Sequence, residues 1–164
     1  MTETSGTENR ARRVWLIRHA KAQKPEPGQT DFDRQLTERG ERQCRAMWEW
    51  LEPRLQQLDA TALYSPAARA SRTAELGLGD WFSGALREEP RIWNATAQEL
   101  AALVEEHAGD HLVLVGHNPG LEQLQAAFSG QLMPLPTGGV FELEFGDQGR
   151  VRLAERFQPE IDSR

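Results

Sequence analysis

The ten residues His111-Leu-Val-Leu-Val-Gly-His-Asn-Pro-Gly120 hold the clearest change from strand to helix in the chain. The apolar run after His111 predicts a buried strand over 111–115. Asn118 and Pro119 suit the cap and the first position of a helix, and apolar residues at helical spacing follow them. A strand that leads directly into a helix is the repeating unit of layered α/β domains.

Two earlier stretches predict the same kind of unit. Residues 14–17 form the first buried-strand pattern, and residues 61–64 form a shorter one. The second pattern runs into Ser65 and Pro66, which again suit a helix cap and a first helical position, so we expect a helix over 66–76. The chain therefore alternates strands with helices, which is typical of a parallel sheet.

The segments between these units also alternate. A polar loop over 21–33 precedes Thr37, which suits the N-cap of a helix that Pro53 should break or kink near its end. A weak third strand is expected over 85–87, and the helix after it should close at Gly109. Each expected strand is thus followed by a helix.

The C-terminal part of the chain has a different pattern. Two segments of alternating polarity, 139–145 and 150–157, are separated by Gly146-Asp-Gln-Gly149, which predicts an antiparallel hairpin. We therefore expect an α/β fold. It should be a three-layer α/β/α sandwich with a mostly parallel central sheet, an antiparallel C-terminal hairpin and no cap domain.

The length and composition fit one domain. The 164 residues are 38% apolar, which is enough for a single hydrophobic core. Residues 1–12 are polar and lack apolar periodicity, so we expect a disordered tail there. The domain is predicted over 13–158, with a short C-terminal tail over 159–164.

The charge and the cysteine content exclude several classes of protein. The formal net charge of -6 offers no broad cationic face to nucleic acid. Cys44 is the single cysteine, which excludes an internal disulfide and points to a reducing compartment. No apolar stretch is long enough to span a membrane and the N-terminus lacks a secretory signal, so we expect a cytoplasmic protein. The oligomeric state is not indicated.

Several phosphate-handling motifs are missing. Gly77-Leu-Gly79 lacks the third glycine of a dinucleotide-binding loop, and no glycine-rich loop ends in Gly-Lys-Ser/Thr. A cysteine phosphatase needs an arginine six residues after its cysteine, but six residues after Cys44 stands Trp50. Asp31-Phe-Asp33 resembles a paired-aspartate phosphotransfer site, yet it lies in a polar loop and not at a strand end, so we discount it.

Histidine and arginine residues follow three of the expected strands. Arg18 and His19 follow the first strand, Arg69 lies one turn into the helix after Pro66, and His117 ends the strand over 111–115. Ligands bind at the carboxyl ends of strands in open α/β sheets, so these four residues could converge. Two guanidinium groups can bind phosphoryl oxygens, and a neutral imidazole nitrogen can attack phosphorus. This chemistry needs no metal and no cofactor.

Each of these residues also has a simpler interpretation. A lone histidine is more often a structural side chain than a nucleophile, and His107 and His111 are interpreted in that way. Arg69 could lie on a helix surface without a function, as Arg72 is expected to do. The joint pattern of four residues favours a phosphate site over these interpretations.

The chain resembles the histidine phosphatase superfamily, also called the phosphoglycerate mutase-like family, in four motifs that occur in the family's order. Its short length is similar to the SixA-like branch of small phosphohistidine phosphatases, which lack an inserted cap. The chain departs from many members at Ala20, where they have glycine, and the difference is one methyl group. The motifs are Leu16-Ile-Arg-His-Ala20, Leu36-Thr-Glu-Arg-Gly40, Tyr64-Ser-Pro-Ala-Ala-Arg-Ala70 with Thr73, and Leu114-Val-Gly-His-Asn-Pro-Gly120, followed by Pro136-Thr-Gly-Gly139.

The resemblance implies a role for each member of the group. His19 would be the nucleophile that becomes phosphorylated, and His117 would complete the pocket and stabilise the transition state. Arg18 and Arg69 would bind the phosphoryl oxygens. Larger relatives use a carboxylic acid after the third strand as proton donor, for which Glu88 and Glu89 are the candidates here.

The resemblance also implies a reaction, with alternatives. We expect a metal-independent phosphatase that acts on a phosphohistidine protein through a phosphohistidine enzyme intermediate. A phosphomonoesterase for a small phosphorylated metabolite is the alternative within enzymes, because a phosphate pocket says little about what carries the phosphate. A non-catalytic phosphohistidine-binding module is the alternative outside enzymes. Neither a nucleic acid nor a membrane is expected as a partner.

Overall fold

Alternate residues of strand β1 (Arg12–Arg18) pack into two separate hydrophobic cores. Val14 and Leu16 belong to one core, and Trp15 and Ile17 belong to the other. All four side chains are buried, so β1 is covered on both faces. A strand of this kind belongs to a sheet that lies between two layers of helices.

The computed structural model describes residues 11–159 and contains one six-stranded sheet. The strand order is β3-β2-β4-β1-β5-β6, and the neighbouring pairs from β3 to β1 are parallel. Strand β5 is antiparallel to both β1 and β6. After β1, the strands are β2 (Ala60–Tyr64), β3 (Ala85–Glu88), β4 (His111–Gly116), β5 (Val140–Phe145) and β6 (Val151–Phe157).

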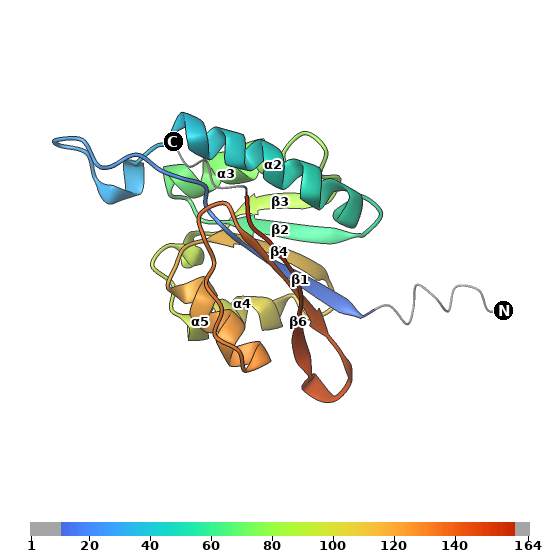
Figure 1. The fold of residues 1–164 in the computed structure, drawn as a ribbon. Coiled ribbons are helices and arrows are strands. Elements are labelled where there is room, and N and C mark those ends of the chain that lie inside the picture. The colour runs from blue at the N-terminus through green and yellow to red at the C-terminus, as the bar shows by residue number, and fades with distance from the viewer. Residues whose placement is uncertain (1–10, 160–164) are drawn as a thin grey trace.

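Four helices cover the two faces of this sheet (Figure 1). Helices α2 and α3 cover one face and contribute to the core of Trp15 and Ile17. Helices α4 and α5 cover the other face and contribute to the core of Val14 and Leu16. The predicted three-layer sandwich with its C-terminal hairpin is therefore confirmed, and residues 11–159 form it without an inserted cap. The helices are α2 (Glu38–Leu55), α3 (Ala68–Gly77), α4 (Ala97–Glu106) and α5 (Gly120–Ser129).

The ends of the structured part differ slightly from the prediction. Strand β1 begins at Arg12, one residue before the predicted start of the domain at 13. Its guanidinium donates to the carbonyl oxygens of Val104, His107 and Asp110, which fixes this end of the strand. The rest of the predicted N-terminal tail, residues 1–10, lies outside the described residues. So does most of the predicted C-terminal tail, residues 160–164.

Two helix ends differ from the prediction. Helix α2 continues through Pro53 and ends two residues later at Leu55, because Leu51 and Leu55 are both buried in the core and hold the last turn in place. The helix after Pro66 begins at Ala68, and Ala67 is its N-cap in place of Ser65. The Ser65 hydroxyl instead forms hydrogen bonds with His117 and with the Ala67 N–H.

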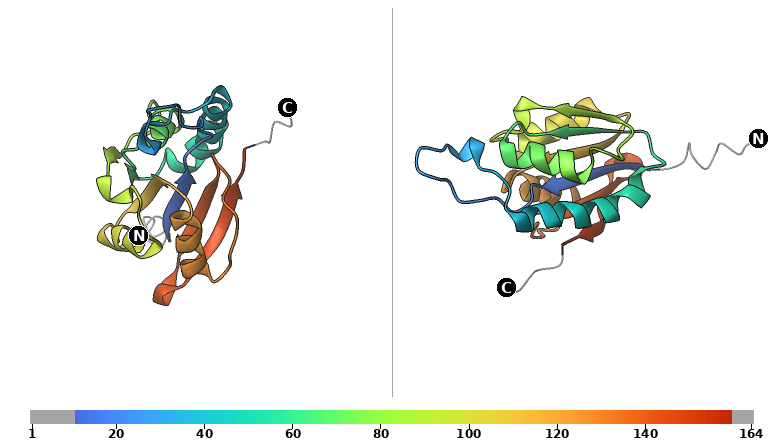
Figure 2. Two further views of the ribbon diagram at one scale, coloured as in Figure 1. Left: turned by 90° about the vertical axis from the view of Figure 1, so that its left-hand side faces the viewer. Right: turned by 90° about the horizontal axis from the view of Figure 1, so that it is seen from above.

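The loop between β1 and α2 projects from the body of the molecule at the carboxyl end of β1 (Figures 1 and 2). The short 3-10 helix η1 (Asp31–Asp33) lies within this loop. At its base, the Thr37 N–H donates to the Lys21 carbonyl oxygen at 3.0 Å, and the Thr37 side chain caps α2 at Gly40 N. A Cβ atom at Gly40 would overlap the Lys21 carbonyl oxygen, so the loop and the helix approach closely only because residue 40 is glycine.

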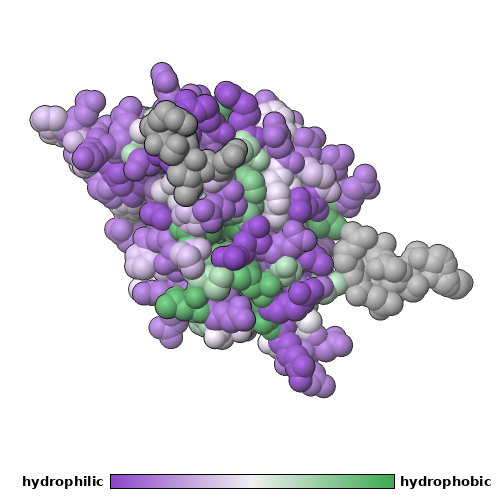
Figure 3. Space-filling view, in the orientation of Figure 1, coloured by the Kyte–Doolittle hydropathy of each residue, from purple (hydrophilic) through white to green (hydrophobic). Residues whose placement is uncertain are grey.

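The surface of the domain is largely polar. Figure 3 shows mainly hydrophilic residues on the face of Figure 1, with hydrophobic residues gathered in its lower half, near α5. Within residues 11–159, we find no helix with both the length and the apolar character needed to cross a bilayer. Cys44 is a buried free thiol, and burial raises its pKa to about 12.

Candidate active site

His19 and His117 leave two adjacent parallel strands at the same level. Arg18 of β1 pairs in register with Gly116 of β4, and each histidine is the next residue. The His19 N–H donates to the Gly116 carbonyl oxygen at 3.1 Å. The two ring centroids are 5.3 Å apart, with the ring planes inclined at 52°. The sheet register thus brings together two histidines that are far apart in the sequence.

The hydrogen bonds of His19 define the state of its ring. His19 Nδ1 lies 2.8 Å from the carbonyl oxygen of Ala20, so Nδ1 carries the proton and donates it. His19 Nε2 then has a free lone pair, and it accepts a hydrogen bond of 3.3 Å from Arg69 Nε. This tautomer presents Nε2 as the nucleophilic atom of the ring.

Both histidines are neutral at pH 7. Burial lowers the pKa of His19 to about 3, and the positive charges of Arg69 and Arg18 act in the same direction. The backbone hydrogen bond to Ala20 opposes these effects only in part. Burial, assisted by Arg69, lowers the pKa of His117 to about 4. A neutral imidazole is the form that can attack phosphorus.

Arg69 is held between His19 and the projecting loop. Its side chain lies in the first turn of α3 and is 5% exposed. While Nε donates to His19, Nη1 donates to the Asp31 carbonyl oxygen at 2.7 Å and Nη2 to Asp31 Oδ2 at 3.2 Å. Thr73, one turn further along α3, accepts from the Ala20 N–H and donates to the Arg69 carbonyl oxygen. These contacts fix α3 against the residues that follow β1.

Arg18 and His117 each have a nitrogen atom without a partner. Among the described residues, Arg18 Nε and His117 Nδ1 are buried and lack a hydrogen bond. A different nitrogen of each side chain is engaged: Arg18 Nη1 donates to the Leu135 carbonyl oxygen at 3.0 Å, and His117 Nε2 lies 2.8 Å from Ser65 Oγ. Buried polar atoms are normally paired, so unpaired nitrogens beside two guanidinium groups fit an oxyanion.

The four predicted residues therefore lie together, but two residues that hydrogen-bond to them, Asp31 and Ser65, were not predicted as site residues. Asp31 was discounted because it lies in a loop, yet this loop folds back onto Arg69. Burial would raise the pKa of Asp31, but hydrogen bonds from Arg34 and the charge of Arg69 outweigh it and lower the pKa overall. Ser65 was interpreted as a helix cap. Its position directly after β2, level with the other strand ends, was the signal that could have identified it.

A cavity of about 370 Å³ opens beside this group. Trp93, Arg69 and His117 form part of its wall, whereas Arg18 and His19 do not line it. The other lining residues are Asp31, Asn94, Ala95, Thr96, Asn118, Pro119, Gly120 and Gln123. Within residues 11–159, no group of three or more His, Cys, Asp or Glu side chains is arranged to hold a metal ion.

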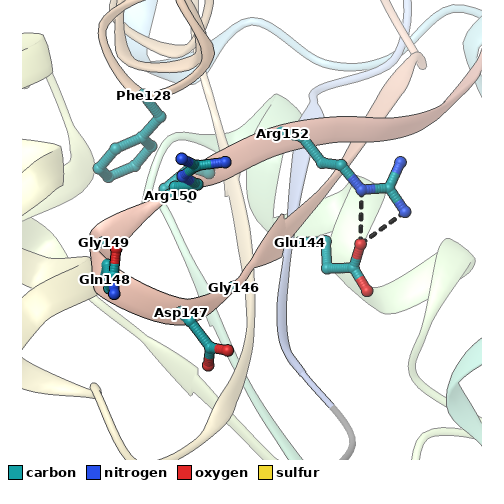
Figure 4. Close-up of a pocket in the computed structure, with 9 residues that line it drawn as sticks. Phe128, Glu144, Gly146, Asp147, Gln148, Gly149, Arg150 and Arg152 are labelled. Atoms are coloured by element: carbon teal, nitrogen blue, oxygen red, sulfur yellow. Dashed lines mark hydrogen bonds and ion pairs between the residues drawn. The ribbon is translucent and has the colours of Figure 1, made fainter.

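A larger hollow, of about 780 Å³, lies at the turn of the β5–β6 hairpin. Figure 4 shows Phe128 of α5 beside Arg150 at this turn, and Arg152 paired with Glu144 further along the hairpin. The turn is next to the start of β1, because Arg12 pairs with Phe145. The hollow is thus at the opposite end of β1 from His19, and it contributes nothing to the candidate site.

Neither candidate for a proton donor lines the cavity. Glu88 is an exposed residue at the end of β3. The Glu89 carboxylate accepts hydrogen bonds from the Arg91 side chain and backbone, and these bonds lower its pKa. Glu89 is therefore an ionised cap of the 3-10 helix η2 (Pro90–Ile92), which is a structural role.

Comparisons with known proteins agree with this geometry. The family model of the histidine phosphatase superfamily (branch 1) matches residues 14–92, which include Arg18, His19 and Arg69. No curated protein sequence matches the chain.

Solved structures match over nearly the whole chain. A putative phosphohistidine phosphatase SixA from Agrobacterium tumefaciens is 28% identical, with a TM-score of 0.80, and the match covers 91% of this chain and 99% of that one. A putative SixA from Nakamurella is 24% identical over 92% and 98% of the two chains, with a TM-score of 0.77. The protein histidine phosphatase SixA complexed with tungstate is 24% identical over 90% and 97%, with a TM-score of 0.73. The chain is therefore similar to the histidine phosphatase superfamily (branch 1) over residues 14–92, and it has the fold of these SixA structures.

Proposed function

We propose that the protein is a metal-independent phosphatase that removes phosphate from protein phosphohistidine through a phosphorylated His19. The observation that carries this proposal is the state of the His19 ring. Its Nδ1 is held by the Ala20 carbonyl oxygen, its pKa of about 3 keeps it neutral, and its Nε2 is directed at a permanently charged arginine. A neutral ring with one free nitrogen beside a cation is suited to attack a phosphoryl group.

The reaction has two displacements. In the first, the His19 Nε2 lone pair forms a bond to phosphorus while the bond from phosphorus to the leaving group breaks, and the leaving group takes that electron pair and a proton from solvent water. In the second, water attacks the phosphorus of the phosphohistidine and the bond to His19 Nε2 breaks. This step releases inorganic phosphate and returns the lone pair to His19.

The cationic residues around His19 stabilise the charge of the phosphoryl group in both steps. Arg18 and Arg69 supply permanent positive charge, and Arg18 Nε and His117 Nδ1 are the buried nitrogens that a phosphoryl oxygen could pair with. Arg69 Nε covers the attacking lone pair of His19 in the free enzyme. The incoming phosphoryl group must therefore displace this hydrogen bond, and Arg69 can then donate to the phosphoryl oxygens instead.

The choice of substrate follows from the lack of a suitable acid in the described cavity. Asp31 is the carboxylic residue that lines it, and the pKa of Asp31 is lowered, so it is ionised at neutral pH. An alkoxide leaving group needs a proton donor, whereas the imidazole of a phosphohistidine leaves without strong assistance. This difference favours phosphohistidine over a simple phosphomonoester. The cytoplasmic location expected from the sequence belongs to the same proposal.

The test is a dephosphorylation assay on a phosphohistidine protein, run beside a panel of small phosphomonoesters. We expect phosphate release from the phosphohistidine protein, the same rate in the presence of a metal chelator, and an acid-labile phosphoenzyme. The matched control is His107→Ala, which removes a histidine outside the site and should leave the rate unchanged. Turnover of a small metabolite alone would favour the phosphomonoesterase, and binding without any turnover would favour a binding module.

A further inference from the structure

Trp93 stands out among the residues around the cavity because the other lining side chains are polar or small. It follows η2, where the preceding residue, Ile92, is buried in the core and fixes the backbone. The indole ring lies in the cavity wall, 5.3 Å from the ring of His117 in an edge-to-face arrangement. The Arg69 guanidinium lies over it, with Cζ 5.5 Å from the ring centroid.

A second aromatic residue holds this ring in place. Phe32, from the projecting loop, meets Trp93 in an edge-to-face contact with ring centroids 5.1 Å apart. The indole is therefore fixed from three sides by Phe32, Arg69 and His117. A rigid aromatic wall at this position can select a ligand by the shape and chemistry of the part that it touches.

We propose that Trp93 determines the leaving-group specificity of the site and favours substrates whose phosphate is carried by an aromatic or heteroaromatic ring. This inference rests on the proposed function and names the part of the substrate that Trp93 recognises. The imidazole of a phosphohistidine is such a ring, and the phenyl group of an aryl phosphate is another. An alkyl phosphate has no ring for Trp93 to contact.

The geometry supports this assignment. Arg69 and His117, which are placed to hold the phosphoryl group, are the same two residues that contact Trp93. The leaving group is bonded directly to that phosphorus, so a ring at this position is within reach of the indole. Two aromatic rings in contact prefer offset or edge-to-face arrangements, and such a contact strengthens binding roughly 2- to 10-fold. Trp93 and Arg69 line the same cavity, so the indole borders the space from which a substrate reaches the phosphate-binding residues.

The test measures kcat/KM of each variant on each substrate and divides it by the value for the unaltered enzyme on the same substrate. The intrinsic reactivity of the substrate cancels in this ratio. For Trp93→Leu, which keeps an apolar side chain but removes the ring, we expect kcat/KM for a phosphohistidine protein and for phenyl phosphate to fall about 5- to 10-fold. The value for glycerol phosphate should change less than 2-fold. Trp93→Phe should retain most of the preference. The inhibition constant of inorganic phosphate, which has no leaving group, should stay the same in all three proteins.

The control is Trp48→Leu, which removes a tryptophan of α2 whose indole N–H donates to Glu52 of the same helix. It should leave every ratio unchanged. If Trp93→Leu lowers both substrate classes equally and weakens phosphate inhibition, Trp93 only supports Arg69 and the inference is overturned. If the unaltered enzyme hydrolyses alkyl phosphates and not phosphohistidine, the proposed function fails, whatever Trp93→Leu does. If the enzyme acts on phosphohistidine but Trp93→Leu does not change its preference for ring-bearing over alkyl substrates, the inference about Trp93 is overturned and the proposed function stands.

Discussion

The carboxyl ends of β1 and β4 present the same residue type at neighbouring positions but hold it in opposite ways. At the end of β1, His19 Nδ1 is bonded to the Ala20 carbonyl oxygen and Nε2 faces Arg69. At the end of β4, His117 Nε2 is bonded to Ser65 and Nδ1 has no partner. Burial makes both rings neutral, so their hydrogen-bond partners, and not their pKa values, distinguish their roles.

The bonds of Ser65 indicate what His117 can offer. Ser65 Oγ accepts from the Ala67 N–H at 3.2 Å, so its own proton is available for His117 Nε2. When Ser65 donates in this way, His117 carries its proton on Nδ1 and can donate a hydrogen bond from that atom. The end of β1 thus offers a lone pair and the end of β4 offers an N–H, which are the two properties that a phosphoryl transfer needs.

The largest effect is expected from removing the lone pair. His19→Ala should abolish both turnover and phosphoenzyme formation, because only His19 supplies the attacking atom. The measurement is phosphate release together with labelling by a radioactive substrate and an acid-lability test. An acid-labile adduct that persists in His19→Ala, or an acid-stable adduct in the unaltered protein, would show that another residue is the nucleophile.

Removal of the cation beside His19 should have the next largest effect. Arg69→Ala should slow phosphoenzyme formation roughly 100- to 1000-fold and still leave some acid-labile adduct, because charge is lost but the nucleophile remains. Arg69→Lys should recover part of the rate, since it keeps the charge without the forked donors. The matched control is Arg72→Ala, one turn away, whose guanidinium pairs with Glu75 at the surface. A rate for Arg69→Ala equal to that control would contradict the role of Arg69.

Weaker effects should follow changes at the end of β4. His117→Ala should slow the reaction about 100-fold, as expected for the loss of one donor to the transition state. Ser65→Ala should cost about 10-fold, because His117 Nε2 would lose its hydrogen bond and with it the preference for the Nδ1 proton. The two changes combined should cost no more than His117→Ala alone. Additive costs in a double-mutant cycle would show that Ser65 does not act through His117.

The pH dependence of stability should separate the two rings. Both are neutral when folded, whereas a histidine in the unfolded chain is protonated below its ordinary pKa of 6.5. The unfolded state therefore binds more protons, and the free energy of unfolding should fall as the pH is lowered from about 6.5 towards 4. His19→Asn should reduce this slope, and His117→Asn should reduce it to a smaller extent. Urea unfolding at several pH values measures it, and slopes equal to that of the unaltered protein would contradict the burial argument.

The smallest effect is expected at Asp31. Its carboxylate occupies Arg69 Nη2 in the free enzyme and competes with an incoming oxyanion. Asp31→Asn should therefore tighten inhibition by inorganic phosphate about 2- to 5-fold, a modest change because Asp31 is 57% exposed and solvent screens its charge. Asp33→Asn is the control, since Asp33 accepts from Thr30 and has no contact with Arg69. Weaker inhibition in Asp31→Asn would mean that Asp31 positions Arg69 for phosphate.

The sequence predicted the fold and the four central residues because both depend on local pattern. Apolar runs identified the strands, and the end of a strand identifies the place where Arg18, His19 and His117 lie. The pattern of apolar residues does not predict which side chains a loop contacts, so the contact of Asp31 with Arg69 was not expected.

Other predictions failed where a local preference was overruled by packing. Pro53 lacks a backbone N–H, yet the buried Leu55 keeps the helix intact beyond it. Ser65 is a residue type that often caps helices, but its hydroxyl is hydrogen-bonded to His117. Trp93 gave no signal at all, because a single aromatic residue after a weak strand has no periodicity to mark it.

The glycine at position 40 gives the active site a dependence on a residue that makes no contact with phosphate. Any larger side chain there would push against the Lys21 carbonyl oxygen, two residues after His19. Ala20 is the residue before Lys21. Its carbonyl oxygen accepts the hydrogen bond that sets the tautomer of His19, and its N–H donates to Thr73. A substitution at Gly40 would therefore disturb the hydrogen bond that sets the tautomer of His19, although it replaces none of the four residues proposed to act on phosphate.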